Sequence, residues 1–395
     1  MKKDWTYKKL GEVCDFEGGS QPPKSEWINS PKEGYVRMLQ IRDFTKSREA
    51  EIEYVKLSKK LRLCKSDDVL IGRYGASVGK ILTGLEGAYN VAIIKSIPDE
   101  SQILKRYIRR YFESSVFQKL LQKICVVRAA QAGFAKDDIK DTLIPLPPLS
   151  EQSRIVSRLD AAFGEIEGLK AKAEAQLGEA RALFQATLTQ EMKPKQGWEE
   201  KKLGEEAFVF SGYAFKSGDF RKQGTYQVLR IGNIKQNCIR LSESPIFFET
   251  IDETTLNKSL LKKGDLVVTQ TGTRHKRDYG FVAMVNKENL LLNQRNACVR
   301  YNDILSAQFF LYYSYTDYYK DSFFANEGGT VGQGNVGLSA LREMKYFAPP
   351  LPAQQSIVSR LDALSEKVRE LEEAQKKVIA ECDALKQALL REVFE

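Results

Sequence analysis

Residues 75–80, GASVGK, are the segment closest to a catalytic motif, the phosphate-binding loop of nucleotide hydrolases. That loop needs four residues between its glycines and a Ser or Thr directly after its lysine, because the hydroxyl binds Mg²⁺. Here three residues separate Gly75 from Gly79, and Ile81 follows Lys80. The segment lacks the metal-binding hydroxyl, so we do not expect a nucleotide site.

Acidic residues and the one histidine form no recognisable catalytic pattern either. A nuclease centre would have to combine Pro98 and Asp99 with the distant residues 191–193, EMK. His275 is flanked by arginine and lysine, which disfavour the imidazolium of a Ser/His/Asp mechanism. The chain also has no Asp/Asn-Pro-Pro-aromatic tetrapeptide and no glycine-rich loop suited to S-adenosylmethionine. We therefore expect no catalytic residue in this chain.

Metal, disulfide and membrane sites are equally unsupported. The six cysteines form no CxxC pair, which argues against a zinc cluster and against a disulfide framework. No uncharged apolar run approaches the ~18 residues of a membrane-spanning helix, and no apolar stretch follows the first lysines. The sequence predicts a cytoplasmic protein without a metal or cofactor of its own.

Basic residues are concentrated in two separate blocks. The formal net charge of +9 divides into +8 for residues 1–148, −1 for 149–194, +4 for 195–348 and −2 for 349–395. Two positively charged blocks, each followed by a nearly neutral stretch, indicate a polyanionic partner. Double-stranded DNA is the partner that we expect.

Polar and basic residues in the glycine-rich loops of both blocks are the candidate DNA contacts, because their side chains can address base edges in the major groove. In the first block they are Ser20, Gln21, Lys24, Arg42, Arg73, Tyr74, Lys80, Arg128 and Gln131. In the second they are Tyr213, Lys216, Arg230, Asn233, Thr273, Arg274, His275, Lys276, Arg277, Arg295 and Gln333. For any one of them, a phosphate contact or a solvated surface role is the alternative.

The chain contains an internal duplication. Residues 147–161, PPLSEQSRIVSRLDA, and 349–363, PPLPAQQSIVSRLDA, are identical at eleven of fifteen positions with an offset of 202. A tryptophan followed by KKLGE occurs near the start of each block, at Trp5 and Trp198, and MLQIRDF (38–44) resembles VLRIGNI (228–234). The blocks otherwise differ, so the sequence predicts one frame used twice with different contents.

Each duplicated proline segment introduces a long helical pattern, because proline is tolerated only at the start of a helix. The first apolar stripe is Ile155, Leu159, Ala162, Ile166, Leu169, Ala173, Gln176, Ala180, Leu183 and Thr187. The second is Ile357, Leu361, Leu364, Val368, Leu371, Gln375, Val378, Cys382, Leu385 and Leu389. Steps of four and three over four heptads predict a coiled coil within the chain. Its first helix contains Gly164, Gly168 and Gly178, and small residues in its stripe suggest close packing.

Short β-rich runs such as VLIGRYG and LVVTQTG, each block then ending in an aromatic helical tract, predict an α+β fold. The predicted architecture has two α/β target-recognition domains, residues 1–148 and 195–348. They are separated by two long antiparallel helices, 149–194 and 349–395, which form an intramolecular coiled coil with a pseudo-twofold repeat. A helix of about 40 residues spans about 60 Å, which suits a spacer.

The order of domain, PPL-x-x-Q, helix, domain, PPL-x-x-Q, helix resembles the specificity subunits of type I restriction-modification systems over essentially the whole chain. The resemblance implies that two domains read the halves of a bipartite, asymmetric DNA target. It also implies two modification subunits, which methylate adenine N6, and two restriction subunits, which cleave DNA. S-adenosylmethionine, ATP and Mg²⁺ belong to those partners. By analogy, the modification subunits bind the helix starts through Gln152, Arg154, Arg158, Gln354 and Arg360.

Two other classes of function remain as alternatives. A stand-alone nuclease or methyltransferase would show activity as a purified chain with Mg²⁺ or S-adenosylmethionine. A scaffold of a related defence complex would bind DNA without sequence preference, in a manner that salt weakens. A coiled coil that serves only oligomerisation would not need two copies within one chain.

Overall fold

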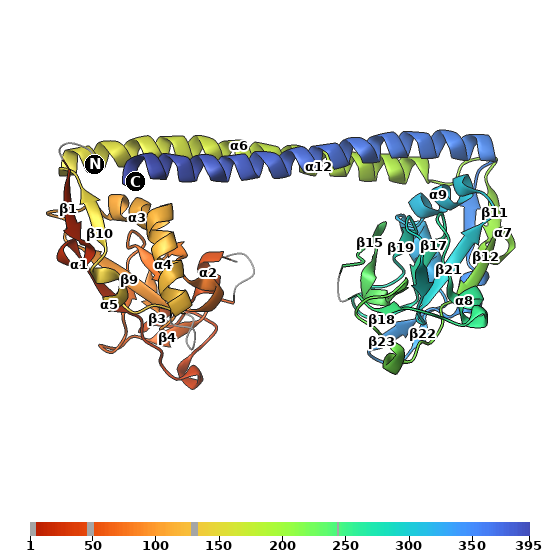
Figure 1. Cartoon of the computed structure of the whole chain (residues 1–395), viewed down its shortest axis with the longest axis horizontal. Helices are drawn as coiled ribbons and strands as arrows, with labels where there is room; N and C mark the ends of the chain where they lie inside the picture. The colour runs from red at the N-terminus through yellow and green to blue at the C-terminus, as the bar shows by residue number, and fades with distance from the viewer. Residues whose placement is uncertain (1–4, 46–50, 128–132, 243–244) are drawn as a thin grey trace. The chain divides into compact units, whose positions relative to one another are not determined.

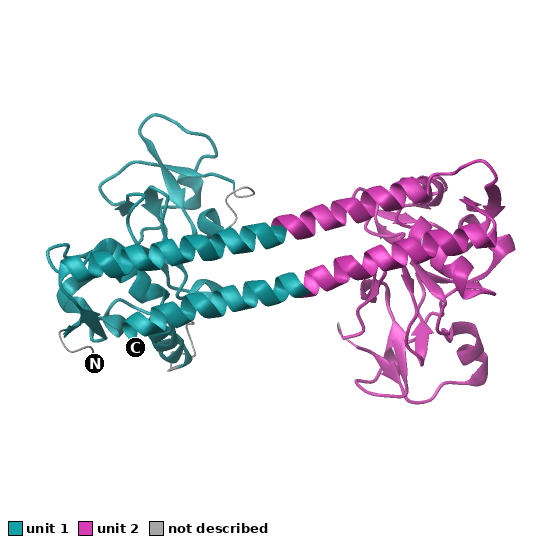
Figure 2. Ribbon diagram, turned by 90° about the horizontal axis from the view of Figure 1, so that it is seen from above, with its two compact units in different colours: residues 1–174, 374–395 teal, residues 175–373 magenta. Residues whose placement is uncertain are grey.

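The computed structural model describes residues 5–45, 51–127, 133–242 and 245–395. The chain divides into two compact units (Figure 2). Unit 1 comprises Met1–Glu174 and Ala374–Glu395, and unit 2 comprises Ala175–Glu373. In the described parts of the chain, no helix is both long and apolar enough to cross a membrane.

Unit 1 is built on two four-stranded sheets. The first has the order β2 (Cys14–Gly18), β9 (Ile93–Pro98), β6 (Leu70–Gly72) and β7 (Ile81–Leu82), all antiparallel. The second has the order β4 (Tyr54–Lys56), β3 (Tyr35–Leu39), β8 (Gly87–Tyr89) and β5 (Leu63–Cys64), with β3 and β8 parallel. The short helix α2 (Ile41–Thr45) follows β3. The loops after β2 and β3 carry several of the predicted DNA contacts.

Helices and a terminal strand pair complete unit 1. Helices α3 (Lys105–Glu113) and α4 (Ser115–Val127) bury Tyr107, Tyr111, Phe112 and Phe117 against the first sheet. Strand β1 (Thr6–Lys9) pairs antiparallel with β10 (Leu143–Leu146), next to α1 (Leu10–Val13) and α5 (Asp137–Lys140). Figure 1 shows β10 leading into the long helix α6 (Leu149–Glu191).

Unit 2 repeats this plan. Its main sheet has the order β12 (Ala207–Ser211), β21 (Asn296–Tyr301), β17 (Leu266–Thr269) and β19 (Val282–Met284). A second sheet joins β16 (Phe247–Phe248), β13 (Tyr226–Leu229) and β20 (Leu290–Leu292), with β13 and β20 parallel, and β11 (Glu199–Lys202) pairs with β24 (Lys345–Ala348). Helices α9 (Ile304–Tyr313) and α10 (Asp317–Phe324) contribute the aromatic core.

Several further elements of unit 2 lie outside this shared plan or support it locally. Strands β14 (Ile234–Lys235) and β15 (Cys238–Ile239) form a hairpin, and β18 (Thr271–Thr273), β23 (Gln333–Asn335) and β22 (Gly328–Gly329) form a small sheet. The remaining helices are α7 (Leu203–Glu206), α8 (Glu253–Ser259) and α11 (Leu338–Arg342). Among the described residues, unit 1 has no sheet that corresponds to β18, β23 and β22.

Atomic details confirm that the two units share one frame. A Cβ added to Gly19 would lie 2.0 Å from the carbonyl oxygen of Asn90, and one added to Gly212 would lie 2.0 Å from that of Asn293. Only glycine permits this close backbone approach. The backbone amide of Asn90 donates to the carbonyl of Leu39 at 3.1 Å, and the backbone amide of Asn293 donates to the carbonyl of Leu229 at 3.2 Å. The predicted duplication is thus present in the fold itself.

The helices α6 and α12 (Leu351–Phe394) begin with the same hydrogen bond. The side chain of Gln152 donates to the carbonyl of Pro147, and that of Gln354 donates to Pro349, both at 2.9 Å. Proline has no amide hydrogen to donate. The hydrogen bond from the buried glutamine to the proline carbonyl therefore fixes the chain at the start of the helix. This bond explains the repeated PPL-x-x-Q sequence.

The two long helices pack antiparallel, as predicted. Within unit 1, Lys170 pairs with Asp383 at 2.5 Å and Glu167 pairs with Lys386, so residue numbers rise on one helix and fall on the other. Within unit 2, Arg181 pairs with Glu372 at 2.6 Å, and Glu191 pairs with Arg360 at 3.0 Å. The α+β architecture with a paired-helix element is therefore confirmed.

The predicted helix seam is correct at most positions and wrong at five. Ile155, Leu159 and Ile166 are buried as expected, and fifteen of the twenty predicted positions are buried or half-buried. Leu169, Gln176 and Leu183 are exposed on α6, and so are Val378 and Leu385 on α12. Buried or half-buried positions on α6 are instead Phe163, Lys170, Leu177 and Phe184, one residue further along.

The glycines of α6 lie outside this seam. A Cβ added to Gly164, Gly168 or Gly178 would meet no atom within 4 Å, so the space beside each of them is open.

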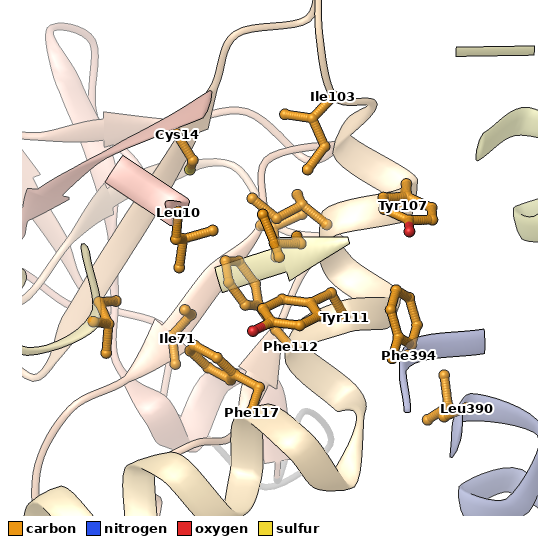
Figure 3. Packing of buried hydrophobic residues seen from close by; sticks show 14 of the residues in the cluster. Leu10, Cys14, Ile71, Ile103, Tyr107, Tyr111, Phe112, Phe117, Leu390 and Phe394 are labelled. Carbon is orange, nitrogen blue, oxygen red and sulfur yellow. The ribbon is translucent and has the colours of Figure 1, made fainter. Parts of the chain in front are cut away.

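The end of each long helix is anchored in a hydrophobic core. In unit 1, Leu390 and Phe394 of α12 are buried beside Tyr107 and Tyr111 (Figure 3). In unit 2, Leu188 and Met192 at the end of α6 are buried in the corresponding cluster. The offset of 202 relates Leu188 to Leu390 and Met192 to Phe394. Both helices therefore end in equivalent anchors.

Candidate nucleic-acid interface

The basic run of unit 2, residues 273–277, forms a loop at the end of strand β18. This strand pairs antiparallel with β23, which places Thr273 opposite Gln333. Strands β22 and β23 form a hairpin whose tip carries the strongly exposed Val331. Figure 1 shows β18, β22 and β23 grouped together in unit 2. The structure thus brings Gln333 next to the basic run, from which it is about 60 residues distant in the sequence.

Specific contacts hold the backbone of this loop and the side chain of Arg277. Asp278 accepts a hydrogen bond of 2.6 Å from the amide of Thr273. The Arg277 guanidinium lies 4.7 Å from the Phe324 ring, and Arg277 adopts a left-handed backbone conformation with φ of 46°. Such a conformation is unfavourable for arginine and is kept only where the surroundings enforce it. The loop is therefore built to present its side chains in a defined arrangement.

Charge in this loop is only partly compensated. Glu327 accepts hydrogen bonds from the Tyr279 hydroxyl and, at 3.3 Å, from Arg274. The Tyr279 hydroxyl, followed by Arg274, holds the pKa of Glu327 below its usual value, so this carboxylate stays ionised. His275 and Lys276 are exposed. The loop keeps a positive charge suited to a phosphate or to a base acceptor.

A second group in unit 2 lies at the end of the parallel strands β13 and β20. Arg230 and Arg295 line an open hollow of about 450 Å³. Arg295 has φ of 71°, and its carbonyl accepts a hydrogen bond of 2.9 Å from the amide of Gln270. The backbone of Tyr213 forms a parallel β-bridge with Asn293, which lines the same hollow. Tyr213 and Lys216 line a second hollow of about 430 Å³. Arg230 and Arg295 therefore lie together in one hollow, and Tyr213 and Lys216 lie together in the other.

Asn233 is a correction to the predicted set. Its side chain is buried, accepts from the amide of Arg230 at 3.0 Å and donates to the carbonyl of Arg240 at 2.9 Å. Asn233 therefore stabilises the turn after β13 and has no free polar group to offer DNA. In unit 1, Asp43 occupies the same place and accepts from the amide of Gln40 at 2.7 Å.

In unit 1, the loops after β2 and β3 form one polar cluster. Lys24 and Arg42 both pair with the buried Glu53, and Ser20 accepts a hydrogen bond from the backbone of Arg62 at 3.1 Å. Gln21 is exposed in the same loop as Ser20. Lys24 and Arg42, although 18 positions apart in the sequence, are therefore joined through one carboxylate.

Arg73, Tyr74 and Lys80 form another group in unit 1. The Arg73 guanidinium lies 4.9 Å from the Tyr74 ring and donates to the carbonyl of Phe134 at 3.2 Å. Lys80 is exposed on a turn that leads into β7. The GASVGK segment is therefore followed by a strand, whereas a phosphate-binding loop is followed by a helix. Arg128 and Gln131 lie outside the described residues.

Sequence reasoning missed two residues of the unit 1 cluster, Gln40 and Glu53. Gln40 occupies the position that corresponds to Arg230, and the similarity of MLQIRDF to VLRIGNI could have identified it. Glu53 gave no such signal, because an acidic residue is not an obvious DNA contact and its partners are distant in the sequence.

The predicted partner-binding residues separate into buried and exposed ones. Gln152 and Gln354 are buried and hydrogen-bonded within the chain, so neither side chain is accessible to a partner, which corrects the prediction for both. Arg154, Arg158 and Arg360 are exposed on the long helices. Arg158 also borders a mostly apolar hollow of about 260 Å³ between α6 and the end of α12 in unit 1.

Burial makes two of the cysteine thiols of unit 1 unreactive. Burial raises the pKa of the Cys14 thiol to about 12 and that of Cys64 to about 11, so both are protonated and unreactive at neutral pH. Among residues 5–45, 51–127, 133–242 and 245–395, no three His, Cys, Asp or Glu side chains are grouped to hold a metal ion.

Comparison with known proteins adds an independent line of evidence. A family model described as the type I restriction modification DNA specificity domain matches residues 2–177 and again residues 195–381. The MjaVIII specificity subunit of Methanocaldococcus jannaschii, a type I restriction enzyme subunit, is 23% identical, with 96% of this chain and 92% of the relative covered. The EcoKI specificity subunit of Escherichia coli is 21% identical, with 100% and 89% covered.

Two solved structures share the fold. A chain from a structure on the assembly and conformational transition of the type I restriction-modification system has a TM-score of 0.73 at 19% identity. The match covers 99% of this chain and 97% of that one. An HsdS subunit from Thermoanaerobacter tengcongensis has a TM-score of 0.52 at 20% identity, with 100% and 97% covered. The identities are low, so these likenesses concern the arrangement of elements.

Proposed function

Because this chain belongs to the family of type I restriction-modification DNA specificity subunits, we propose that each of its two units reads one half of a bipartite, asymmetric DNA target. The chain selects the sequence, and the chemistry takes place on other subunits of the complex. Modification subunits methylate adenine N6 within the selected target, and restriction subunits cleave DNA that lacks the methyl group.

One observation carries the division of labour between the units. The two units have the same strand order and the same glycine approach at Gly19 and Gly212, yet their exposed loops differ at corresponding places. Gln40 of unit 1 corresponds to Arg230 of unit 2, and Ser20 corresponds to Tyr213. A conserved frame with exchanged polar side chains is what two readers of different half-sites require, because base edges differ in donors and acceptors.

The exposed members of both predicted sets would make the DNA contacts. In unit 2, the loop at residues 273–277 and the β22–β23 hairpin supply one surface, and the hollow beside Arg230 and Arg295 supplies another. Most of the positive charges serve phosphates and set the orientation of each unit on the duplex. A smaller number of side chains read the bases.

The paired helices would serve as both spacer and docking surface. The offset of 202 relates the exposed Arg158 to Arg360 and the exposed Leu183 to Leu385, so the duplication presents these positions twice. Arg154 is exposed on the first helix alone, because Ser356 takes its place on the second. Two copies of one partner fit such a repeat, since similar surfaces bind identical subunits. We assign these surfaces to two modification subunits that carry S-adenosylmethionine. Two restriction subunits that use ATP and Mg²⁺ complete a complex located in the cytoplasm.

Methylome sequencing of host cells with and without this gene tests the proposal. We expect one motif to disappear with the gene, and that motif should consist of two specific parts separated by an unspecified spacer. A continuous motif, or an unchanged methylome in a host whose modification subunit is active, would contradict the proposal.

A matched insertion tests the spacer role of the helices. Four residues added after Ala173 of α6, together with four after Gln375 of α12, keep the two helices equal in length. We expect a longer spacer in the methylated motif and unchanged half-sites. A spacer of unaltered length would show that something other than the helices sets it.

A further inference from the structure

Glu53 of unit 1 is a buried carboxylate whose two oxygens are both occupied. Its side chain is 7% exposed. One oxygen pairs with the Lys24 ammonium, and the other accepts from the side-chain amide nitrogen of Gln40 at 2.8 Å and from the Arg42 guanidinium at 2.5 Å. Burial alone would raise the pKa of Glu53, but Lys24 and Arg42 outweigh it and hold the pKa below its usual value. The carboxylate therefore stays ionised.

The three donors come from different segments, and the two cations remain accessible. Lys24 belongs to the turn after β2, Gln40 ends the segment that contains β3, and Arg42 lies in α2. Lys24 is 65% exposed and Arg42 is 43% exposed, and the Lys24 ammonium also lies 4.0 Å from the Trp27 ring centre. Glu53 thus joins the two loops in which sequence reasoning placed DNA contacts.

Unit 2 forms the same backbone without this carboxylate. The amide of Met38 donates to the carbonyl of Glu53 at 2.8 Å, and the amide of Val228 donates to that of Ile246 at 2.9 Å. This register aligns Glu53 with Ile246. The same alignment places Gly232 at the position of Arg42, and the offset of 193 near the start of each block places Ser217 at that of Lys24. The shared frame folds with an isoleucine where unit 1 has a buried charge.

This comparison argues against a role in folding alone. Burying a carboxylate carries a large desolvation penalty, and apolar residues commonly replace such ion pairs without loss of stability. Unit 1 has this network and unit 2 lacks it, so the network is one of the features in which the two units differ. By the proposed function, that difference is the DNA half-site.

The chemistry of the cluster limits what it can recognise. Lys24 and Arg42 only donate hydrogen bonds, and with two cations against one carboxylate the cluster keeps a positive charge. In the major groove, guanine presents two adjacent acceptors, N7 and O6, which are the usual partners of lysine and arginine. Holding both donors in one arrangement lowers the entropy lost on binding.

We propose that Glu53 is a positioning residue that fixes Lys24, Gln40 and Arg42 as one reading cluster, and that Lys24 and Arg42 of this cluster donate to a guanine in the half-site of unit 1. The proposal rests on the proposed function and names the residues that perform it in one unit. It assigns specificity to a carboxylate that touches no DNA.

The test replaces Glu53 with the residue that unit 2 uses. The Glu53→Ile chain is purified in complex with its modification subunits. Binding is then measured on duplexes that carry the methylated motif of the wild type, with each base pair changed in turn. We expect discrimination for a guanine in one half-site to fall about tenfold, the size of one good base contact. Discrimination in the other half-site should stay within about twofold.

Two further variants separate positioning from simple damage. In a Lys24→Met, Arg42→Met background, Glu53→Ile should cause no further loss of discrimination, because Glu53 acts through these two side chains. Asp68→Ala is the matched control: Asp68 accepts from the backbone amide of Lys65 at 3.0 Å, and Asp265 does the same for Lys262 in unit 2. Removing this shared carboxylate should lower the melting temperature and leave base preference unchanged.

Two outcomes overturn the inference while leaving the proposed function intact, and a third contradicts the proposed function itself. If Glu53→Ile weakens binding equally for all duplexes, the cluster contacts phosphates only. If base preference is unchanged in both half-sites, Glu53 serves the fold alone. If the wild type itself shows no bipartite motif, the proposed function fails first. These results are distinguishable because the wild-type profile is measured before any variant.

Discussion

The anchor of α12 in unit 1 gives a stability prediction with a built-in comparison. Phe394 is 6% exposed, and its ring centroid lies 5.4 Å from that of Tyr107 and 5.5 Å from that of Tyr111 (Figure 3). Truncating a buried phenylalanine costs about 3 to 5 kcal/mol, part of which reflects lost aromatic pairs. Phe394 lies in the last turn, where neighbours can partly fill the space. We therefore expect Phe394→Ala to cost about 3 kcal/mol.

Hydrogen exchange measured by mass spectrometry can locate this loss. Phe394→Ala should accelerate amide exchange in α3 and leave α9 protected, because the anchor belongs to the core of unit 1. Met192→Ala removes the equivalent anchor of α6 and should accelerate exchange in α9 instead, with a cost of about 2 to 3 kcal/mol. For a unit of about 200 residues, 3 kcal/mol corresponds to roughly 10 °C in melting temperature.

Leu385→Ala is the control for both anchors, since Leu385 is 50% exposed on the same helix as Phe394. It should change stability by less than about 0.5 kcal/mol. Equal acceleration of exchange in α3 and α9 by Phe394→Ala would refute the reasoning, and so would a stability loss no larger than that of the control.

Three further predictions concern the helices and their junctions. Alanine at each open helical glycine should raise the free energy of unfolding by about 0.5 to 1 kcal/mol in urea titrations; the positions are Gly164, Gly168 and Gly178. Gln152→Leu should cost about 1 to 2 kcal/mol more than Gln354→Leu. The reason is that the side-chain oxygen of Gln152 accepts from the backbone amide of Leu104 at 2.9 Å, whereas within the described residues the side-chain oxygen of Gln354 has no partner. Equal costs would contradict this account. Asp160→Asn should lower stability at pH 7, because Arg110 outweighs burial and holds the pKa of Asp160 below its usual value. That stability is present above the unfolded pKa of about 4 and is lost as pH falls through the lower folded pKa, so the gap from the wild type should close in acid melts.

The duplicated sequence was sufficient to predict the architecture, and the helix seam shows where it was not. Two copies of PPL-x-x-Q at one offset imply two equivalent helices, and helices of this kind bury an apolar face together. The choice between Leu169 and Lys170 as the inward position depended on the partner helix. Lys170 faces inward because Asp383 pairs with it, and this partner is more than 200 residues away.

The predicted DNA contacts stay predictions, and the structure corrects those polar residues whose side chains are buried. The run at 273–277 was identifiable from its charge density alone. In the sequence, Asn233 and Gln152 look like polar residues that contact DNA or a partner protein. In the structure, both side chains donate hydrogen bonds to backbone carbonyls of the same chain. Only the three-dimensional arrangement separates such structural residues from readers. It also reveals Glu53, a buried carboxylate that contacts Lys24, Gln40 and Arg42 from three separate segments.

Exchange of the first predicted target-recognition domain tests the central claim most directly. Residues 1–148 are replaced by the corresponding block of another specificity subunit, and the methylome of cells that carry the chimera is sequenced. One half of the methylated motif should change while the other half and the spacer remain as in the parent. A motif changed in both halves, or in neither, would contradict the assignment of one half-site to each unit.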